Sequence, residues 1–520
     1  MDVPTDAERE RPGGGGDGAG LDRRRFLGAT AAAGVWAAGT MLAGCDTPSD
    51  GDPGTPPGPS EASRPGDSGW RIRSAGPPEA ALGYTDKVSV LPGEDFGLYV
   101  STTAPGFRVS AYRMGWYEGA QARLVWRSGR VAGRIQEDPA LAPGTRTVRA
   151  DWKRTVLVHT DGWPEGAYLL RLDAENGHQR YVPLIVRSAT ASGKTLLIHA
   201  PATWQAYNLW GGYSLYEGAG ASYGTRALAV SFARPYDSNG AEKFLVYERA
   251  VVVLAERLGL PLAYTTGLDI HRDPAVLRGA VSAVTLGHDE YWTPQQRASM
   301  TRARDTGTNL AFLGANTCFR RIRIEDGDRT VVCYKTDYRH DPLYPRHGAL
   351  VTTDFRQVPD PDPESSLTGV LYEGYPTNAP YVVRNAGHWL FTGTGVKQGD
   401  SFPHLVGVEY DRVTPGALPD AAIEIVAHSA LVCNGRRSHS DSAYYTVPSG
   451  AGVFASGTMR WVEGLMAGTE ENGRNHGMDA RTGAFVTRTT ENLLLAFAEG
   501  PAAKARPAPR DNVREVYGSA

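Results

Sequence analysis

Residues 287–292, Gly-His-Asp-Glu-Tyr-Trp, combine an imidazole, two carboxylates and two aromatic rings in one short stretch. His288 and Glu290 are two residues apart, so on extended backbone their side chains point to the same side. One of them could hold a metal or polarise water while the other moves protons. The alternative interpretation is structural: the cluster caps the helix that follows and packs Trp292.

The elements around this stretch alternate between short apolar runs and amphipathic segments from about residue 194. We expect strands at residues 195–199, 262–265, 280–286 and 309–313, and helices at residues 244–258 and 294–306. Such alternation predicts a parallel sheet with helices on both faces. Residues 287–292 then lie at the carboxyl edge of the sheet, where open α/β sheets bind ligands.

The chain of 520 residues is too long for one ordinary domain. About seven short alternating segments with turn-forming residues between them predict an immunoglobulin-like β-sandwich at residues 69–190. An α/β catalytic domain is expected at residues 191–500, followed by a tail at 501–520. Late in that domain we expect β-type segments after residue 320, a strand at 452–461, a loop at 463–473 and a closing helix at 490–499.

The N-terminal residues predict export. Three arginines at 23–25, followed by Phe26-Leu27 and a mildly apolar run, look like a twin-arginine signal. Leu-Ala-Gly-Cys at residues 42–45 resembles a lipoprotein processing box, with Cys45 as the lipidated residue of a signal spanning 1–45. Residues 46–68 would be a disordered tether. A plain N-terminal anchor helix is the alternative, and both interpretations place the folded part outside the cytoplasmic membrane.

Composition excludes some functions. The formal net charge is −3, with 54 basic and 57 acidic residues, so no global basic face indicates nucleic acid. The basic residues at 320–323 are interpreted as a solvated strand edge. Cys318 and Cys333 could pair in an oxidising compartment, or they and Cys433 could be buried thiols.

Three motifs together carry a resemblance: Tyr-Arg-Met-Gly-Trp-Tyr at 112–117, Trp-Gln-Ala-Tyr-Asn at 204–208, and residues 287–292. In this order they resemble the catalytic large (beta) subunit of N,N-dimethylformamidase over about residues 85–500. The resemblance implies an immunoglobulin-like part joined to a glutamine-amidotransferase-like (flavodoxin-like) α/β part. It also implies a mononuclear ferric ion, bound by two tyrosinates and one glutamate, in an enzyme that hydrolyses a small amide.

By motif and order, the resemblance assigns the metal ligands to Tyr168, Tyr207 and Glu290, and pocket roles to His288 and Asn316. The competing phenolates are Tyr213, Tyr216 and Tyr291, and Glu409 and Asp411 are further acidic candidates that are interpreted as salt-bridged loop carboxylates. Phenolate and carboxylate oxygens are hard ligands that suit Fe³⁺. His288 would carry the proton from water to the leaving amine, and Asn316 would hold the oxyanion or orient substrate.

The sequence therefore predicts an extracytoplasmic, iron-dependent amide hydrolase with a small-molecule amide as substrate. The alternative is a cell-surface protein that binds carbohydrate or a protein partner in a metal-free cleft. The resembling enzyme has a lectin-like domain and a small partner subunit, neither of which we expect in this chain. We expect membrane contact only through a lipid on Cys45, and leave a homo-oligomer open.

Overall fold

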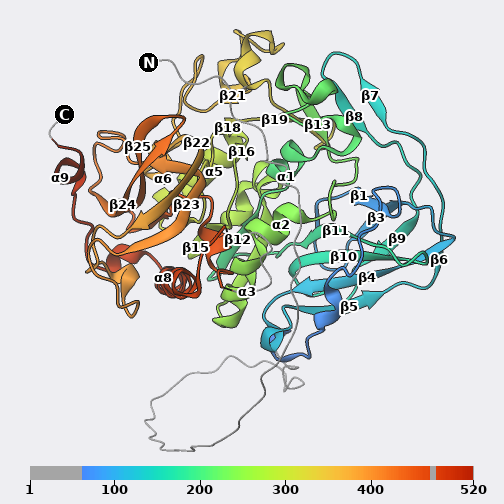
Figure 1. Cartoon of the computed structure of the whole chain (residues 1–520), viewed down its shortest axis with the longest axis horizontal. Helices are drawn as coiled ribbons and strands as arrows, with labels where there is room; N and C mark the ends of the chain where they lie inside the picture. The colour runs from blue at the N-terminus through green and yellow to red at the C-terminus, as the bar shows by residue number, and fades with distance from the viewer. Residues whose placement is uncertain (1–60, 469–475, 519–520) are drawn as a thin grey trace, which may run out of the picture.

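The computed structural model describes residues 61–468 and 476–518. Figure 1 shows the blue and cyan N-terminal strands on one side of the green helices α1 (Pro201–Tyr207), α2 (Glu242–Tyr247) and α3 (Arg249–Arg257). The orange strands β22 to β25, within residues 371–446, lie on the other side. The architecture is mixed α+β and rich in sheet. Among the described residues, no helix is long and apolar enough to cross a membrane. The twin-arginine segment, Cys45 and most of the expected tether lie outside the described residues.

The N-terminal part contains two main sheets, with strand orders β1-β3-β9 and β2-β11-β10-β4-β5, and β6 pairs with β4. The strands are β1 Leu82–Thr85, β2 Ser89–Val90, β3 Asp95–Ser101, β4 Gly106–Met114, β5 Ala122–Arg127, β6 Val131–Ala132, β9 Val156–His159, β10 Gly166–Ala174 and β11 Gln179–Val186. The separate hairpin is β7 Ala140–Ala142 with β8 Thr147–Arg149. These strands occupy the region predicted to be a sandwich, and the immunoglobulin-like assignment stays a prediction.

Strand β10 shows how period-two alternation builds this part. Leu170 and Leu172 face one hydrophobic cluster, together with Leu98 of β3. Leu169 points the other way, into the cluster that includes residues of the α/β part. One strand therefore serves two cores.

The central sheet has seven strands in the order β14-β12-β15-β17-β26-β25-β24. They are β12 Thr195–His199, β14 Leu262–Thr266, β15 Ser282–Thr285, β17 Asn309–Phe312, β24 Ile423–Cys433, β25 Arg436–Thr446 and β26 Gly452–Ala455. The neighbours from β14 to β26 are parallel, and β25 and β24 add antiparallel pairs. The predicted parallel sheet is thus the larger part of a mixed sheet.

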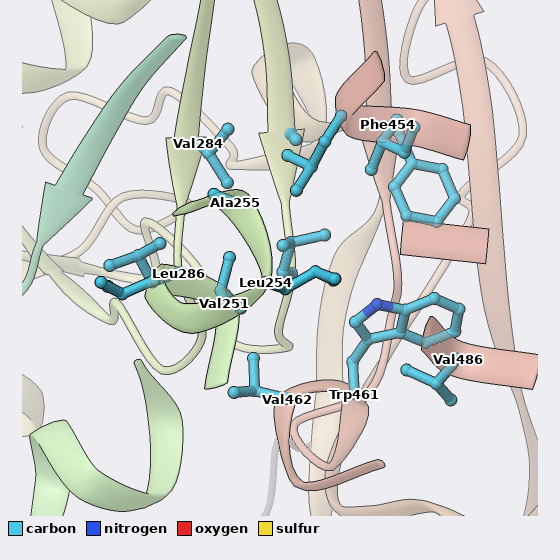
Figure 2. Packing of buried hydrophobic residues seen from close by; sticks show 14 of the residues in the cluster. Val251, Leu254, Ala255, Val284, Leu286, Phe454, Trp461, Val462 and Val486 are labelled. Carbon is cyan, nitrogen blue, oxygen red and sulfur yellow. The ribbon is translucent and has the colours of Figure 1, made fainter. Parts of the chain in front are cut away.

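Helices cover both faces of this sheet. They are α3 Arg249–Arg257 and α8 Ala480–Ala498 over one face, and α4 Gly267–Arg272 and α5 Pro294–Asp305 over the other. Leu197 belongs to the first core and its neighbour Leu196 to the second, because adjacent strand residues point to opposite faces. Figure 2 shows the first core, where Val251 and Leu254 of α3 lie near Val284 of β15.

The bounds of three predicted elements differ from those in the structure. The helix expected at 244–258 is broken at Glu248 into α2 Glu242–Tyr247 and α3. The closing helix begins at Ala480, well before residue 490. The strand expected at 452–461 ends at Ala455, and α7 Trp461–Gly464 extends into the loop expected at 463–473. Residues 469–473 of that expected loop are outside the described part.

The remaining helices and strands lie outside the central sheet. They are α1 Pro201–Tyr207, β13 Ala229–Ser231, β16 Tyr291–Trp292, β18 Arg320–Arg321, β19 Arg323–Glu325, β20 Thr330–Val332, β21 Thr353–Asp354, α6 Ser365–Thr368, β22 Leu371–Val382, β23 Ser401–Arg412 and α9 Val513–Tyr517. Strands β22 and β23 form a long antiparallel ribbon. Cys318, Cys333 and Cys433 are buried free thiols, so the Cys318–Cys333 pair is not formed.

Candidate active site

Three side-chain oxygens meet at the carboxyl edge of the central sheet. The Tyr207 hydroxyl donates a hydrogen bond to Glu290 Oε2 at 2.7 Å. The Tyr216 hydroxyl lies 2.7 Å from the same carboxylate oxygen and 2.7 Å from the Tyr207 oxygen. The three oxygens therefore form a triangle with sides of hydrogen-bond length.

Local structure brings these residues together. Helix α1 begins with Pro201 directly after β12 and ends at Tyr207. The hydroxyl of Thr203, also on α1, accepts a hydrogen bond from Glu290 N at 3.1 Å. The loop after α1 returns when Leu215 N donates to Ala206 O at 2.9 Å, which places Tyr216 beside Tyr207.

Glu290 is an ionised carboxylate whose two oxygens contact different residues. Its second oxygen, Oε1, accepts a hydrogen bond from Arg320 Nε at 3.2 Å. Lys335 Nζ lies 2.9 Å from the centre of the Tyr216 ring. Burial alone would raise the pKa of Glu290, but the nearby His288, Arg320 and Lys335 outweigh burial and lower it to about 2.

The pKa values of the two phenols shift in the opposite direction to that of Glu290. Burial raises the pKa of Tyr207 and of Tyr216 well above the ordinary value, and the adjacent Glu290 charge raises both further. Both phenols are therefore protonated at neutral pH, which agrees with their donating to Glu290. A cation that replaced these protons would find three hard oxygens.

His288 lies next to the triangle. Its Nε2 is 3.5 Å from Glu290 Oε2, and its ring centre is 5.0 Å from that of Tyr207. Neither ring nitrogen has a hydrogen-bond partner among the residues that the structure describes. Burial lowers the pKa of His288 despite the neighbouring carboxylate, so a neutral imidazole is available as a base.

Tyr207, Tyr216, His288, Glu290 and Arg320 open on one cavity of about 400 Å³. It is lined by Tyr207, Leu209, Ser214, Tyr216, Glu217, Asp237, Lys243, Tyr247, His288, Glu290, Asn316, Arg320, Tyr372, Tyr375, Val408, Glu409 and Met459. Asn316 follows β17 with φ of 61°, and its N–H donates to Asp411 Oδ1 at 2.8 Å. Its buried Oδ1 has no hydrogen-bond partner within the described ranges.

The structure thus brings together four of the five predicted site residues and not the fifth. Tyr168 lies in β10, where its hydroxyl donates to Pro164 O at 2.6 Å and its ring stacks on Trp163 with centres 5.1 Å apart. It shares the sandwich-facing side of β10 with Leu170. Period-two alternation within 166–174 is a sequence signal that would have directed Tyr168 into that core.

Among the competing phenols, Tyr216 is the one whose oxygen reaches Glu290. The Tyr291 ring is perpendicular to the rings of Tyr207 and Tyr216 at 6.4 Å, and Tyr213 does not line the cavity. Because adjacent residues on extended backbone point to opposite sides, the sequence predicted that Tyr291 faces away from Glu290. No feature of the sequence favoured Tyr216 over Tyr213 as the second phenol.

Two further interpretations need correction. Arg320 and Arg321 are each 2% exposed, so residues 320–323 are not a solvated edge. Arg320 was missed as a site residue because its partner Glu290 is distant in sequence. Glu409 and Asp411 lie in strand β23 and not in a loop; Glu409 lines the cavity, and Asp411 is buried behind Asn316.

The donor set decides which cations suit the site. In the described part of the chain, no group of three or more His, Cys, Asp or Glu side chains is placed to hold a metal ion. The triangle of Tyr207, Tyr216 and Glu290 instead offers two phenol oxygens and one carboxylate oxygen. Such oxygens fit a hard trivalent cation better than zinc.

Comparison with known proteins identifies a family. A family model described as "N,N-dimethylformamidase beta subunit-like, C-terminal" matches residues 108–476, which contain every residue of the cavity. No curated protein matches the chain. Among solved structures, a cycloisomaltooligosaccharide glucanotransferase from Paenibacillus sp., complexed with cycloisomaltoheptaose, aligns at 7% identity with a TM-score of 0.14. That alignment covers 49% of this chain and 33% of the other.

Proposed function

Because the chain belongs to the N,N-dimethylformamidase beta subunit-like family, which its motifs predicted, we propose that it hydrolyses amides in the cavity at the carboxyl edge of the central sheet. The family match suggests a dimethylformamidase-like amide hydrolase. The observation that carries the proposal is the triangle of Tyr207, Tyr216 and Glu290 oxygens, each 2.7 Å from the other two, with a buried neutral histidine beside it.

We propose a mononuclear ferric ion as the cofactor, held by Tyr207, Tyr216 and Glu290. The three hard oxygens support this choice, and Tyr216 takes the place that the motif order gave to Tyr168. When bound, the ion would supply Lewis-acid activation of the amide carbonyl and of water. Arg320 holds Glu290 Oε1 and so keeps Oε2 directed to the phenols.

His288 is the proposed proton carrier. Its neutral imidazole accepts a proton from the attacking water as the new C–O bond forms at the carbonyl carbon. It then gives that proton to the nitrogen as the C–N bond breaks, which releases a carboxylic acid and an amine. The Asn316 side chain, whose buried Oδ1 has no hydrogen-bond partner among the described residues, orients the amide.

The family name denotes a beta subunit, which implies a partner subunit in general. The sequence supports three finer proposals: an immunoglobulin-like N-terminal part, an amidotransferase-like α/β part, and twin-arginine export with lipidation at Cys45. A metal-free cell-surface binding protein is the competing function.

Purified full-length chain, exported in folded form, tests the proposal. We expect bound iron at one-to-one stoichiometry, a visible tyrosinate-to-iron absorption band, and release of amine from at least one simple amide. A strong chelator should remove the band and the activity, and iron should restore both. An ordered protein that neither binds iron nor cleaves any amide after iron loading would contradict the proposal and favour the binding protein.

A further inference from the structure

The cavity is larger than the smallest amides require. Its volume is about 400 Å³, within the roughly 300–1,000 Å³ of pockets that hold drug-sized ligands. The five non-hydrogen atoms of dimethylformamide fill roughly 150 Å³ if each takes about the 30 Å³ share of a water molecule. A tiny amide would leave more than half of the cavity to water.

The β22–β23 ribbon contributes aromatic and apolar side chains to the cavity wall, together with the carboxylate of Glu409. Tyr372 and Tyr375 come from β22 and Val408 from β23. Met459 lies beside them, because its N–H donates to Glu409 O at 3.3 Å. A ligand binds most favourably to such side chains when it covers them with a ring or an alkyl chain.

The charges of the lining disfavour an anionic substrate. Four carboxylates line the cavity, from Glu217, Asp237, Glu290 and Glu409, against the two cations of Lys243 and Arg320. Arg320 is already committed to Glu290 at 3.2 Å. A carboxylate on the substrate would meet like charge in a partly enclosed space.

We propose that the substrates are neutral amides with an aryl or extended apolar substituent. The amide group lies at the triangle of Tyr207, Tyr216 and Glu290, and the substituent lies on the wall formed by Tyr372, Tyr375 and Met459. This inference rests on the proposed function and names the substrate class of the same site.

Three probes separate the contributions of size and charge. Acetanilide is a neutral aryl amide, 4-acetamidobenzoate adds a carboxylate to the same skeleton, and dimethylformamide is the small reference. Binding to the protein with and without iron is measured by calorimetry, and kcat/KM is measured on the iron-loaded protein. We expect acetanilide to bind roughly tenfold or more tightly than either other probe, and the same order in kcat/KM.

Variants of Tyr375 connect the preference to the wall. Tyr375 is half-buried, so its replacement spares the core. Tyr375→Ala should lower the ratio of acetanilide to dimethylformamide kcat/KM about fivefold or more, and Tyr375→Phe should keep it, because the ring is what contacts the substituent. Tyr338→Ala, a half-buried tyrosine outside the cavity, is the control that should not change the ratio.

The possible outcomes distinguish the two proposals. If dimethylformamide is cleaved at least as efficiently as acetanilide, the substrate class is wrong while the hydrolase stands. If acetanilide binds in the expected order and no amide is cleaved, the hydrolase fails and the preference for neutral aryl amides is supported. Equal binding of all three probes would overturn the inference whatever the activity.

Discussion

The proposed role of Glu290 depends on its two carboxylate oxygens having different hydrogen-bond partners. Arg320 takes Oε1, and the two phenols take Oε2. Local sequence could predict His288 and Glu290, because a spacing of two places both on one side of extended backbone. It could not predict Tyr216 or Arg320, because a returning loop and a distant strand bring them to the carboxylate.

Asp411 offers a pH test at the residue scale. Burial raises its pKa to about 7 although the Asn316 N–H opposes this, whereas an unfolded chain has the ordinary pKa of 3.8. The folded state therefore holds a proton that the unfolded state loses between pH 4 and 7. The stability due to this group is present below about pH 4 and is lost as pH rises through 7.

Asp411→Asn removes this titration and keeps an oxygen for Asn316. Urea unfolding at several pH values should show the variant gaining on the wild type from pH 4 to 7, by at most about 4 kcal/mol. A stability difference that does not change with pH would contradict the raised pKa.

At the scale of elements, the break between α2 and α3 serves the site. Glu248 leaves helical geometry at the break, and its carboxylate accepts hydrogen bonds from Trp204 Nε1 at 2.7 Å and from Ala200 N at 3.2 Å. It also contacts His199 Nδ1 at 2.5 Å. These contacts fix the junction of β12 with α1, the helix that ends at Tyr207.

Glu248→Ala should lower the free energy of unfolding by about 3 kcal/mol or more, because several buried donors lose one acceptor. It should also lower kcat for amide hydrolysis, since α1 loses its anchor. Glu242→Ala in the first turn of α2 is the control, with an effect within about 0.5 kcal/mol. Equal unfolding free energies for the two variants would show that Glu248 is not an anchor.

Hydrophobic periodicity predicted the presence of helices and strands better than it predicted where they begin and end. The alternation after residue 194 predicted strands and helices on both faces of the sheet, as the cores on either side of Leu196 and Leu197 demonstrate. The break at Glu248 was missed because apolar spacing continues through it. The β22–β23 ribbon was predicted only as β-type segments, since pairing between residues 371–382 and 401–412 is not local.

At the scale of the whole molecule, the motif at 112–117 joins the two parts of the chain. Arg113 of β4 forms a buried ion pair with Glu256 of α3 at 2.5 Å and donates to Tyr117 Oη at 2.8 Å. Tyr264 of β14 donates to the same carboxylate at 2.6 Å. The motif therefore has a structural role outside the cavity lining, which motif order alone could not predict.

Arg113→Leu should lower the free energy of unfolding by about 3–5 kcal/mol, because Glu256 stays buried without its cation. Urea unfolding followed by tryptophan fluorescence measures this. Arg130→Leu, which removes the exposed pair with Glu175, is the matched control and should change little. If both variants lost the same stability, the two parts would not be joined through Arg113.

The most direct test of the central claim compares two tyrosines. Iron content and amide hydrolysis are measured for Tyr216→Phe and Tyr168→Phe, each of which removes one hydroxyl and keeps the ring. If Tyr216 completes the site, Tyr216→Phe weakens iron binding at least about 100-fold and abolishes hydrolysis, while Tyr168→Phe retains both. Loss of iron and activity in Tyr168→Phe, with both retained in Tyr216→Phe, would contradict the site.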